Sequence, residues 1–237
     1  MRFGTLYLIP SNLSDPFSPA QILPAAVIST AIRLSHYVAE NAKSARTFLK
    51  KIGVDRPLLE ISIRELNSHT RDSELAEMMV PLQAGHDVGL LSEAGAPGVA
   101  DPGAIVVALA HEHGYAVMPL VGPSAILLGL MASGLNGQKF AFHGYLPQEK
   151  TARATAIVAL EGESRQRNMT QMFIETPYRN QPLYADLLAY LAPSTLLCIA
   201  RDLTGNCEFV QTKRVSEWRK KTLPMEKLPT LFLLLAK

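Results

Sequence analysis

The chain has 237 residues, of which 48% are hydrophobic, and its formal charge is +2. This length is enough for one large domain or for two small domains with cores of their own. The two cysteines, Cys198 and Cys207, do not have a metal-binding spacing, and Cys198 lies in an apolar run that suits a small buried residue. This cysteine usage fits a reducing compartment, so we expect a cytoplasmic protein.

The formal charge is unevenly distributed along the chain. Residues 1–121 hold 9 basic and 12 acidic side chains, or −3, whereas the remainder holds 14 and 9, or +5. A basic second half hints at a polyanionic partner, although ordinary surface solvation is the simpler explanation of charge alone.

Neither a signal peptide nor a membrane span is expected. The chain runs from Met1 directly into strand-like residues. The uncharged stretch 117–135 is interrupted by Pro119, Gly122 and Pro123, which favours a strand, a turn and a short helix over a span.

In the first half of the chain, short apolar runs alternate with helical patterns of about ten residues. The expected strands are Leu6–Ile9, Tyr37–Ala39, Leu58–Ser62, Val88–Leu91 and Ala116–Leu120. The expected helices are Pro19–Leu34, Ser44–Ile52, Ser73–Gln83 and Ala104–Ala110. This alternation is typical of βαβ units around a parallel sheet.

The stretch that organises this half is the strand Val88–Leu91 and the loop after it. The strand carries no charge, which suits burial on both faces of a parallel sheet. The loop Ser92–Gly103 is rich in glycine and proline, so its backbone can approach a ligand, and Asp101 is placed as an N-cap of the next helix. Its glycines fit neither the dinucleotide fingerprint nor a P-loop, and a connection without any ligand is the alternative.

The regular alternation of strands and helices ends after a turn at Gly122–Ser124 and a helix over Ala125–Ala132. The later expected elements are a helix at Arg179–Leu191 and strands at Phe140–Phe142, Met172–Glu175, Leu196–Ala200, Glu208–Gln211 and Leu231–Leu235. The Glu208 strand follows its predecessor too closely for a helical crossover, which favours an antiparallel or mixed sheet. We therefore predict two α/β domains, residues 1–120 with a mainly parallel sheet and residues 121–237 with a mixed sheet.

Four loops at the ends of expected strands are candidates for ligand contacts, because open parallel sheets bind ligands at such ends. They are Pro10–Asp15, Ser92–Gly103, Gly122–Ser124 and Glu175–Arg179. Ser124 opens a helix whose free N–H groups suit a carboxylate, or is a plain N-cap. Glu93 suits ribose hydroxyls or a cation, or is a solvated loop residue. We find no Ser-His-Asp signature, no H-E-x-x-H and no cysteine cluster, and we expect no metal.

Several ordered motifs resemble those of the small-subunit ribosomal RNA ribose 2′-O-methyltransferases, a branch of the tetrapyrrole methylase superfamily. LLSEAGAPGVADPG is similar to that family's V-S-D-A-G-T-P-G-I-S-D-P-G, and GTLYLIPSNLSD to its opening strand and P-I-G-N-L-x-D loop. LVGPSA, FHGYLP, FIETPYR and ARDLT resemble its P-G-P-S-A, F-x-G-F-L-P, F-Y-E-S-P-H-R and A-R-E-L-T. The likeness is collinear over almost the whole chain.

The resemblance implies a homodimer of two-domain subunits that binds S-adenosylmethionine in a cleft between the domains. Carried over by position, the methyl donor would contact Pro10, Ser92, Glu93, Ala94, Gly95, Ala96, Ser124, Ala125, Tyr178, Leu203 and Thr230. The strand pattern selects the first three donor loops independently, whereas donor contacts around Tyr178, Leu203 and Thr230 are implied by the resemblance alone.

Some family positions differ here. The loop aspartate and threonine are Glu93 and Ala96, and the glycine near the start is Ser11. The family's E-D-T-R is the segment 40–43, Glu-Asn-Ala-Lys, and its Y-H-E-H-N is the segment 63–67, Ile-Arg-Glu-Leu-Asn. If segment 40–43 lines the RNA surface, its changes bear on the target more than on the fold or the donor.

Methyl transfer to a ribose hydroxyl needs alignment of donor and acceptor, together with a base or a cation at the hydroxyl. Glu175, Arg179 and Arg201 are the candidate catalytic residues, and a structural ion pair between Glu175 and Arg201 is the alternative. Candidates for phosphate contacts, or for a solvated surface, are Lys213, Arg214, Arg219, Lys220 and Lys221.

Three functions compete at this point. The first is an S-adenosylmethionine-dependent methyltransferase of a ribose 2′-hydroxyl in small-subunit ribosomal RNA. The second is a methylase of a tetrapyrrole or another small molecule, and the third is a catalytically degenerate donor-binding protein. The motif set favours the first.

Overall fold

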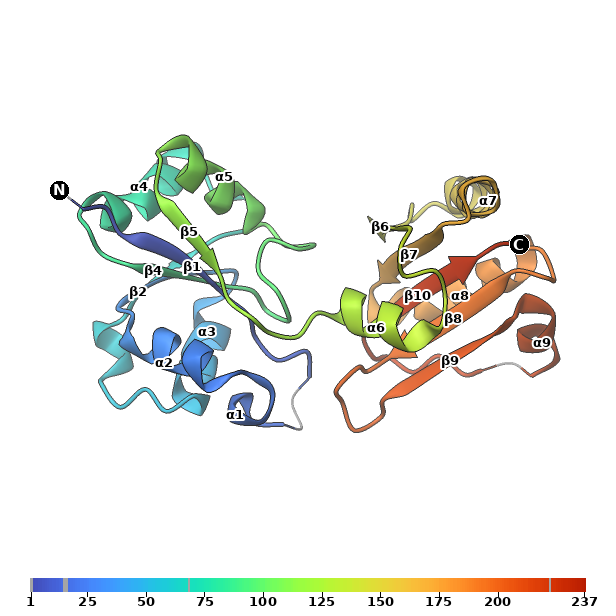
Figure 1. Ribbon diagram of the computed structural model, residues 1–237, viewed down its shortest axis with the longest axis horizontal. Helices are drawn as coiled ribbons and strands as arrows, with labels where there is room; N and C mark the ends of the chain where they lie inside the picture. The colour runs from blue at the N-terminus through green and yellow to red at the C-terminus, as the bar shows by residue number, and fades with distance from the viewer. Residues whose placement is uncertain (1, 15–16, 68, 222) are drawn as a thin grey trace. The chain divides into compact units, whose positions relative to one another are not determined.

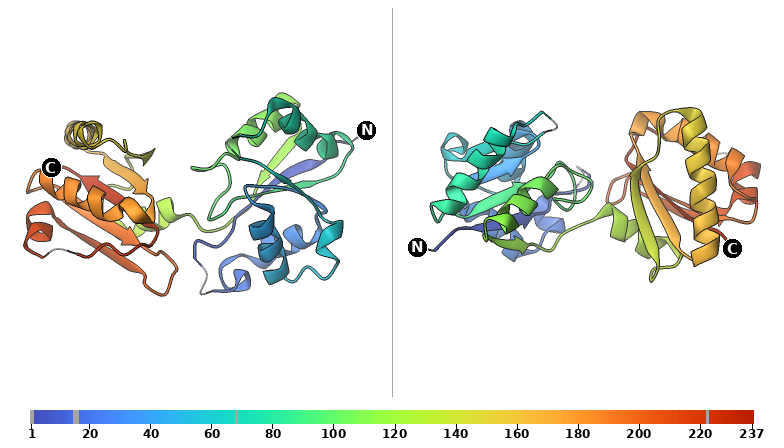
Figure 2. Two further views of the ribbon diagram at one scale, coloured as in Figure 1. Left: turned by 180° about the vertical axis from the view of Figure 1, so that it is seen from behind. Right: turned by 90° about the horizontal axis from the view of Figure 1, so that it is seen from above.

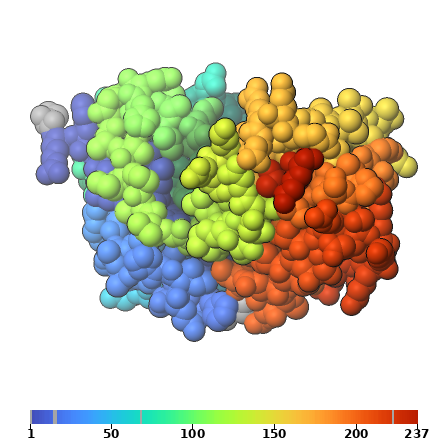
Figure 3. Space-filling model, turned by 45° about the vertical axis from the view of Figure 1, so that its right-hand side comes forward, coloured from blue at the N-terminus to red at the C-terminus, as the bar shows by residue number. Residues whose placement is uncertain are grey.

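The computed structural model describes residues 2–14, 17–67, 69–221 and 223–237, and it contains two compact units, Met1–Ser124 and Ala125–Lys237 (Figure 1). Each unit holds one five-stranded sheet with helices in its described residues. Figure 3 shows one face of the chain in space-filling form, coloured by residue number. The predicted fold class, two α/β domains with a parallel and a mixed sheet, is confirmed. Asp15, at the end of one candidate loop, lies outside the described residues.

The first sheet has the strand order β3-β2-β4-β1-β5, and all of its pairings are parallel. Its strands are β1 (Thr5–Ile9), β2 (His36–Ala39), β3 (Ser62–Glu65), β4 (Val88–Leu91) and β5 (Ala116–Pro119). The middle strand, β4, is buried at all four positions, as its uncharged sequence predicted. A Cβ atom at Gly89 would lie 2.7 Å from the Tyr37 ring, so β4 and β2 pack closely only because this residue has no side chain.

Helices cover both faces of the first sheet (Figure 1). They are α1 (Pro19–Ile22), α2 (Ala25–Arg33), α3 (Ala42–Lys51), α4 (Asp72–Gln83) and α5 (Ala104–Glu112). One apolar cluster joins α4 and α5 to strand residues such as Leu6 and Leu90, and a second joins α2 and α3 to Ile9 and Leu91. Because neighbouring side chains of a strand point to opposite faces, the two clusters lie on opposite sides of the sheet.

Two expectations in this unit are wrong in detail. The expected helix Pro19–Leu34 is two helices, because Pro24 disfavours helical geometry at Leu23, whose backbone is extended. The expected strand Leu58–Ser62 is a 3₁₀ turn, η1 (Leu58–Glu60), and the strand begins only at Ser62. The apolar residues before Ser62 misplaced the strand, since β3 is an edge strand and its own residues are largely polar.

The second sheet has the order β6-β7-β10-β8-β9 and is mixed, as expected. Its strands are β6 (Phe140–Tyr145), β7 (Thr170–Glu175), β8 (Leu196–Arg201), β9 (Phe209–Arg214) and β10 (Thr230–Leu235). Of the pairings among the described strands of this sheet, β6 with β7 is parallel and the others are antiparallel, including β8 with β9, as their short connection predicted.

Helices cover both faces of this sheet as well (Figure 2). They are α6 (Ala125–Ser133), α7 (Lys150–Arg167), α8 (Asn180–Tyr190), which follows the 3₁₀ turn η2 (Pro177–Arg179), and α9 (Val215–Lys220). A core of α7, α8 and α9 residues packs on Phe232 and Leu234. On the other face α6 approaches β10, where a Cβ atom at Gly129 would lie 2.4 Å from Leu231 Cδ2. Among the helices described, none is both long and apolar enough to cross a bilayer.

Candidate functional site

Two loops at the carboxyl edge of the first sheet are joined by main-chain hydrogen bonds. The Ser11 N–H donates to the Gly95 carbonyl at 2.9 Å, and the Gly95 N–H donates to the Ser11 carbonyl at 3.2 Å. These loops follow the paired strands β1 and β4, so the parallel pairing brings them together. The structure thus places the candidate loops after Ile9 and Leu91 side by side, 84 residues apart in sequence.

Hydroxyl groups hold the turn after β4. The Ser11 hydroxyl donates to the Ser92 carbonyl at 2.9 Å, and the Ser92 hydroxyl donates to the Gly95 carbonyl at 3.1 Å. Gly95 has a φ of +76°, and a Cβ atom there would lie 3.0 Å from Leu13 Cδ2. The turn therefore needs glycine for its backbone geometry, and the serine that replaces the family's glycine at position 11 acts as a support.

The segment before α6 lies against the same loops. A Cβ atom at Gly122 would lie 2.2 Å from Pro10 Cγ, and one at Gly95 would lie 3.5 Å from the Pro123 carbonyl oxygen. Pro10, the Gly95 turn and the segment before Ser124 therefore converge within the first unit. Ser124 directly precedes α6, and its role as N-cap or ligand contact stays a prediction.

Asp101 does not cap the helix after the loop as expected. The N-cap position of α5 is Gly103, and the Asp101 carboxylate accepts hydrogen bonds from the N–H groups of Gly98 at 2.8 Å and Gly103 at 2.7 Å. Burial raises the pKa of Asp101. The carboxylate therefore lies before α5 and links Gly98 in the glycine-rich loop to Gly103 at the start of this helix.

Glu93 is held by the helix that follows β2. The Ser44 hydroxyl donates to Glu93 Oε2 at 3.0 Å, and the Glu93 N–H donates to Glu40 Oε1 at 3.3 Å. Burial raises the pKa of Glu40. Two carboxyl groups thus lie at the carboxyl ends of β2 and β4, a setting that suits hydroxyl groups or a cationic group of a ligand.

A pocket of about 470 Å³ opens beside these carboxyl groups, within the size range of small-molecule sites. Its polar lining includes Ser11, Asn12, Asn41, Lys43, Ser44, Ser92 and Glu93. The side chain of Asn41 accepts hydrogen bonds from the N–H groups of Lys43 and Ser44, and so caps α3. Sequence reasoning noted this segment only as a departure from the family. Its position directly after a strand of the parallel sheet is the signal that would have selected it.

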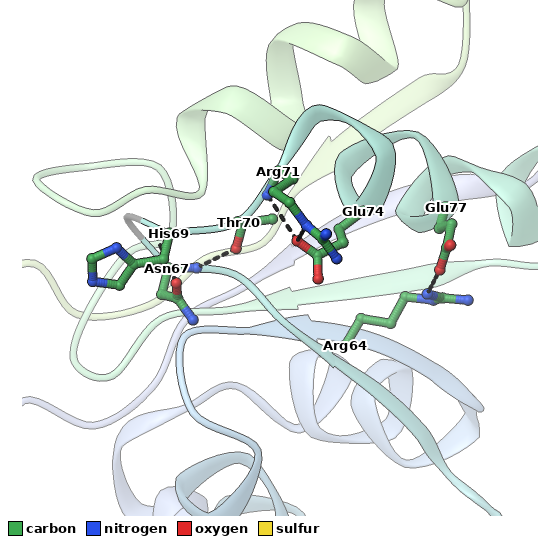
Figure 4. A network of polar contacts seen from close by, with 7 residues as sticks. All are labelled: Arg64, Asn67, His69, Thr70, Arg71, Glu74 and Glu77. Carbon is green, nitrogen blue, oxygen red and sulfur yellow. Dashed lines mark hydrogen bonds and ion pairs between the residues drawn. The ribbon is translucent and has the colours of Figure 1, made fainter.

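The segment after β3 is also polar but more exposed (Figure 4). Arg64 pairs with Glu77 at 2.6 Å, and the Asn67 N–H donates to the Thr70 hydroxyl at 2.9 Å. Exposed pairs of this kind contribute little to stability. One contact reaches the pocket wall, because Glu65 accepts a hydrogen bond from the Ala42 N–H at 2.8 Å, at the start of α3.

Three predicted site residues form a row across the second sheet. Thr230 on β10 lies directly opposite Glu175 on β7 and directly opposite Arg201 on β8. All three are buried. Directly opposite residues of antiparallel strands point to the same face, so the sheet gathers these side chains at one place.

Glu175 and Arg201 do not form the structural ion pair that was the alternative to a catalytic role. Arg179 donates to Glu175 Oε1 from Nε at 3.0 Å and from Nη2 at 2.7 Å, and these hydrogen bonds raise the pKa of Arg179. The Arg201 side chain instead donates to the Pro224 carbonyl and lies 3.7 Å from Glu226 Oε2. The structure therefore pairs Glu175 with Arg179, and not with Arg201.

Asn180 is a polar residue that sequence reasoning missed. It is fully buried, and its Nδ2 donates to Thr230 Oγ1 at 3.1 Å and to the Leu228 carbonyl at 2.8 Å. Nothing local in the sequence distinguishes it from an ordinary residue of a helix start.

The remaining predicted positions differ in their surroundings. Tyr178 is 77% exposed, with Lys227 Nζ 5.2 Å from the centre of its ring. Leu203 is buried in a turn between Asp202 and Thr204, which both have positive φ values.

The five basic residues predicted as phosphate contacts differ in their surroundings. Arg219 donates to the carbonyls of Leu188 and Leu191, and Lys213 Nζ lies 4.8 Å from the Trp218 ring, so both have structural contacts. Arg214, Lys220 and Lys221 are exposed, and so is Arg219 despite its two hydrogen bonds, whereas Lys213 is half-buried. The described residues contain no group of three His, Cys, Asp or Glu side chains that suits a metal ion.

Two solved structures have the same fold as this chain. The methyltransferase CobJ superposes with a TM-score of 0.64 over 100% of this chain and 95% of its own, and diphthine synthase with 0.69 over 99% and 90%. Both are 14% identical in sequence, which shows the fold alone. This chain shares their fold, and together with the sequence relatives described next this confirms the tetrapyrrole methylase superfamily that the motifs predicted.

Sequence relatives identify the family within this fold, although no family model matches the chain. The ribosomal RNA small subunit methyltransferase I of Xylella fastidiosa is 32% identical over 210 residues, which are 87% of this chain and 71% of the relative. The protein of that name from Escherichia coli O157:H7 is 31% identical over 217 residues, or 90% and 70%. The chain belongs to the ribosomal RNA small subunit methyltransferase I family and is a methyltransferase.

Proposed function

We propose that this protein transfers a methyl group from S-adenosylmethionine to a ribose 2′-hydroxyl of small-subunit ribosomal RNA. The observation that carries the proposal is the membership of a family whose curated members are named as small-subunit ribosomal RNA methyltransferases. The ribose hydroxyl as the acceptor rests on the motif resemblance, and the geometry of the loops supports the donor.

The loop after β4 fits a donor that carries hydroxyl groups and a positive charge. The Gly95 turn is narrow, and the Glu93 carboxylate is oriented by Ser44 at the edge of a pocket of about 470 Å³. S-adenosylmethionine supplies, when bound, a methyl group on a positively charged sulfur. In the proposed arrangement Ser92–Ala96 bind the donor through their backbone, with Pro10 and Ser124 beside them.

The contacts from the second unit belong to the proposal too. They are Ala125, Tyr178, Leu203 and Thr230. Three further points also stay predictions. They are the assignment of the donor-binding loop to a domain of residues 1–120, the homodimer and the cytoplasmic location.

For the transfer itself, the contacts favour Arg179 as the group that stabilises developing charge. The buried Glu175 accepts two hydrogen bonds from Arg179 and a third from the Thr176 N–H at 2.6 Å, all on Oε1. This arrangement holds the guanidinium, whose side chain is 34% exposed, in one orientation. A cation beside a hydroxyl would favour loss of its proton to water as the oxygen–methyl bond forms and the sulfur–methyl bond breaks, with the electron pair of the broken bond left on sulfur. We assign the same task to Arg201 on β8, which is separated from β7 by β10.

The basic second half supports a nucleic-acid acceptor. Exposed cations such as Lys220 and Lys221 suit contacts with phosphate groups, which carry no sequence information but contribute most of the affinity. Reversing both charges should weaken RNA binding and leave donor binding unchanged, since neither residue is among the proposed donor contacts.

The test is to supply labelled S-adenosylmethionine with small ribosomal subunits or with a tetrapyrrole precursor. Label in a ribose of the ribosomal RNA, located by mass spectrometry of its nucleosides, is the expected result. Label in the tetrapyrrole alone would identify a small-molecule methylase. Donor binding without transfer to either acceptor would identify a degenerate donor-binding protein.

A further inference from the structure

A second pocket of the first unit lies at the opposite edge of its sheet from the candidate site. It has a volume of about 450 Å³ and is lined by residues at the amino ends of β1, β2 and β4, among them Thr5, His36 and Asp87. The strands are parallel, so this edge is remote from the loops that follow their carboxyl ends. We propose that this pocket binds a phosphate group.

The charges of the lining favour an anion. Arg2, Arg33, His36 and His86 contribute to the wall, and Asp87 is the single acidic residue among the described residues that line it. The lining therefore carries a net charge of +1 when both histidines are neutral and +3 when both are protonated. Guanidinium and imidazolium groups are among the side chains that bind phosphate oxygens with charge-assisted hydrogen bonds.

The one carboxylate of the lining is already engaged. Asp87 Oδ2 lies 2.7 Å from Arg33 Nη1, and Asp87 Oδ1 accepts a hydrogen bond from the Thr5 N–H at 2.8 Å. Asp87 thus orients Arg33, which also lies 4.9 Å from the centre of the Tyr7 ring. Because it competes with any other anion for Arg33, its removal should strengthen phosphate binding.

The loop that carries His86 is fixed by close backbone packing. A Cβ atom at Gly4 would lie 1.9 Å from the His86 carbonyl oxygen, so the residue before β1 approaches this loop as closely as a residue without a side chain allows. The His86 N–H donates to the Pro81 carbonyl at 2.9 Å. Gly85 before it has a φ of +87°. The wall of the pocket is therefore formed before any ligand arrives, which reduces the cost of binding.

The two imidazoles of the pocket face each other and other cations. The ring centres of His36 and His86 are 5.3 Å apart. Burial, followed by the charges of His86 on the neighbouring loop and Arg64 on β3, lowers the pKa of His36. The other charged or titratable groups that line the pocket come from the N-terminal segment, α2, β1 and the start of β4, and are Arg2, Arg33, Tyr7 and Asp87.

A bound anion would offset the repulsion at His36, so binding should raise the lowered pKa of His36.

Two sources can supply such a group, a phosphodiester of an RNA strand or a free phosphate. The shared chemistry is the phosphate oxygen. The experiment uses no methyl donor, so its outcome is independent of whether the proposed methyl transfer occurs.

The test is to titrate the full-length protein with inorganic phosphate while the imidazole C–H signals are followed by NMR at pH 6.5. We expect both His36 and His86 to shift. The change Arg33→Gln should weaken binding about three- to tenfold, as expected for a partly exposed charge contact. His86→Gln, which leaves the Arg33–Asp87 pair intact, should weaken it similarly, and Asp87→Asn should strengthen it.

Arg167→Gln is the matched control, since Arg167 is an exposed arginine of the second unit, paired with Glu163, and should leave the affinity unchanged. Absence of shifts, or equal affinities in Arg33→Gln, Asp87→Asn and the control, would overturn the proposal. A parallel titration with a single-stranded RNA decamer identifies the source. RNA affinity that falls in Arg33→Gln but not in the control indicates a strand phosphate, and an effect on inorganic phosphate alone indicates a free one.

Discussion

The two units build their polar sites from different kinds of group, main-chain atoms in the first unit and side chains in the second. In the first unit the backbone defines the candidate site, through the Ser11–Gly95 bridge and glycines at positive φ. In the second unit buried side chains define it, with Glu175, Thr230 and Arg201 in one row of the sheet. A loop at the end of a parallel strand can shape a site with main-chain atoms alone, whereas a sheet has already paired its main-chain atoms and must use side chains.

This difference predicts that substitutions act through conformational strain in the first unit and through loss of charge pairs in the second. The largest effect should follow from breaking the buried ion pair between α7 and α8. Arg153 donates to Asp186 Oδ2 from Nε at 2.8 Å, and the two side chains are only 9% and 10% exposed. The change Arg153→Met leaves a buried charge without a partner and should lower the free energy of unfolding by about 3–5 kcal/mol. Urea denaturation measures this loss.

The control for this change is the double variant Arg153→Met/Asp186→Leu, which removes both charges. It should recover most of the lost stability, because no unpaired charge remains. A double variant as unstable as the single one would show that packing, and not charge, stabilises the contact between these helices.

The second effect tests the backbone of the first unit. The change Gly95→Val imposes a branched side chain on a φ of +76° and a contact of 3.0 Å with Leu13, at a cost of roughly 1–3 kcal/mol in unfolding free energy. We also expect donor binding to fall below detection in calorimetry, because the side chain distorts the turn.

Gly114→Val is the matched control for strain. Gly114 has a φ of +70°, and an added Cβ atom would meet nothing within 4 Å. It should lose stability but bind the donor normally. If a folded Gly95→Val variant also binds with unaltered affinity, the donor does not contact this turn.

The third effect tests the charge row of the second unit. The change Glu175→Gln removes the charge that holds Arg179 and keeps the shape of the side chain, so the rate of transfer should fall about 10- to 100-fold. Donor affinity should stay within about threefold. Glu226→Gln is the control, because Glu226 is more than half exposed and lies 3.7 Å from Arg201. Equal rates in the two variants would exclude a role of Glu175 in the reaction.

The smallest effect concerns the exposed ion pair of the first unit. Burial opposes ionisation of Asp87, but the hydrogen bonds from Arg33 and Thr5 outweigh it and lower the pKa of Asp87 below its ordinary 3.8. The stabilisation by this charge is therefore complete well above pH 3.8 and is lost as the pH falls through the lower pKa of the folded state. Since the pair is 49% and 28% exposed, we expect less than about 1 kcal/mol.

Comparison of Asp87→Asn with the natural protein between pH 2 and 7 checks this sign. The two stability curves should converge at low pH and separate as the pH rises. A separation that grows toward low pH would contradict the assigned direction.

Much of the fold could be predicted because its strands are short apolar runs between strong breakers. The strand β4 has the predicted bounds, because its four buried residues lie between a charged and a polar residue that mark its two ends. The strand β3 could not be located in the same way, because an edge strand needs no apolar sequence and the apolar residues before it form a 3₁₀ turn. The break at Pro24 was readable in principle, since proline restricts the residue before it.

The candidate site shows the same division. The glycine-rich loop could be predicted from the sequence because glycine and proline directly indicate the backbone geometry. Asn180 is invisible because its importance depends on Thr230, 50 residues away, and the pocket at the amino edge depends on three loops that only the sheet brings together. Sequence alone predicts residues whose role is local, and the fold is needed for residues whose role depends on distant partners.

The hydrogen-bonded bridge between Ser11 and Gly95 also has a consequence for local unfolding. Each of these two amides is protected from solvent by the carbonyl of the other loop, so neither loop can open while the other stays closed. Their amide hydrogens should therefore exchange with deuterium through a shared opening event and show similar protection factors, although the two residues lie in separate segments of the chain. The two loops behave in this respect as one cooperative unit.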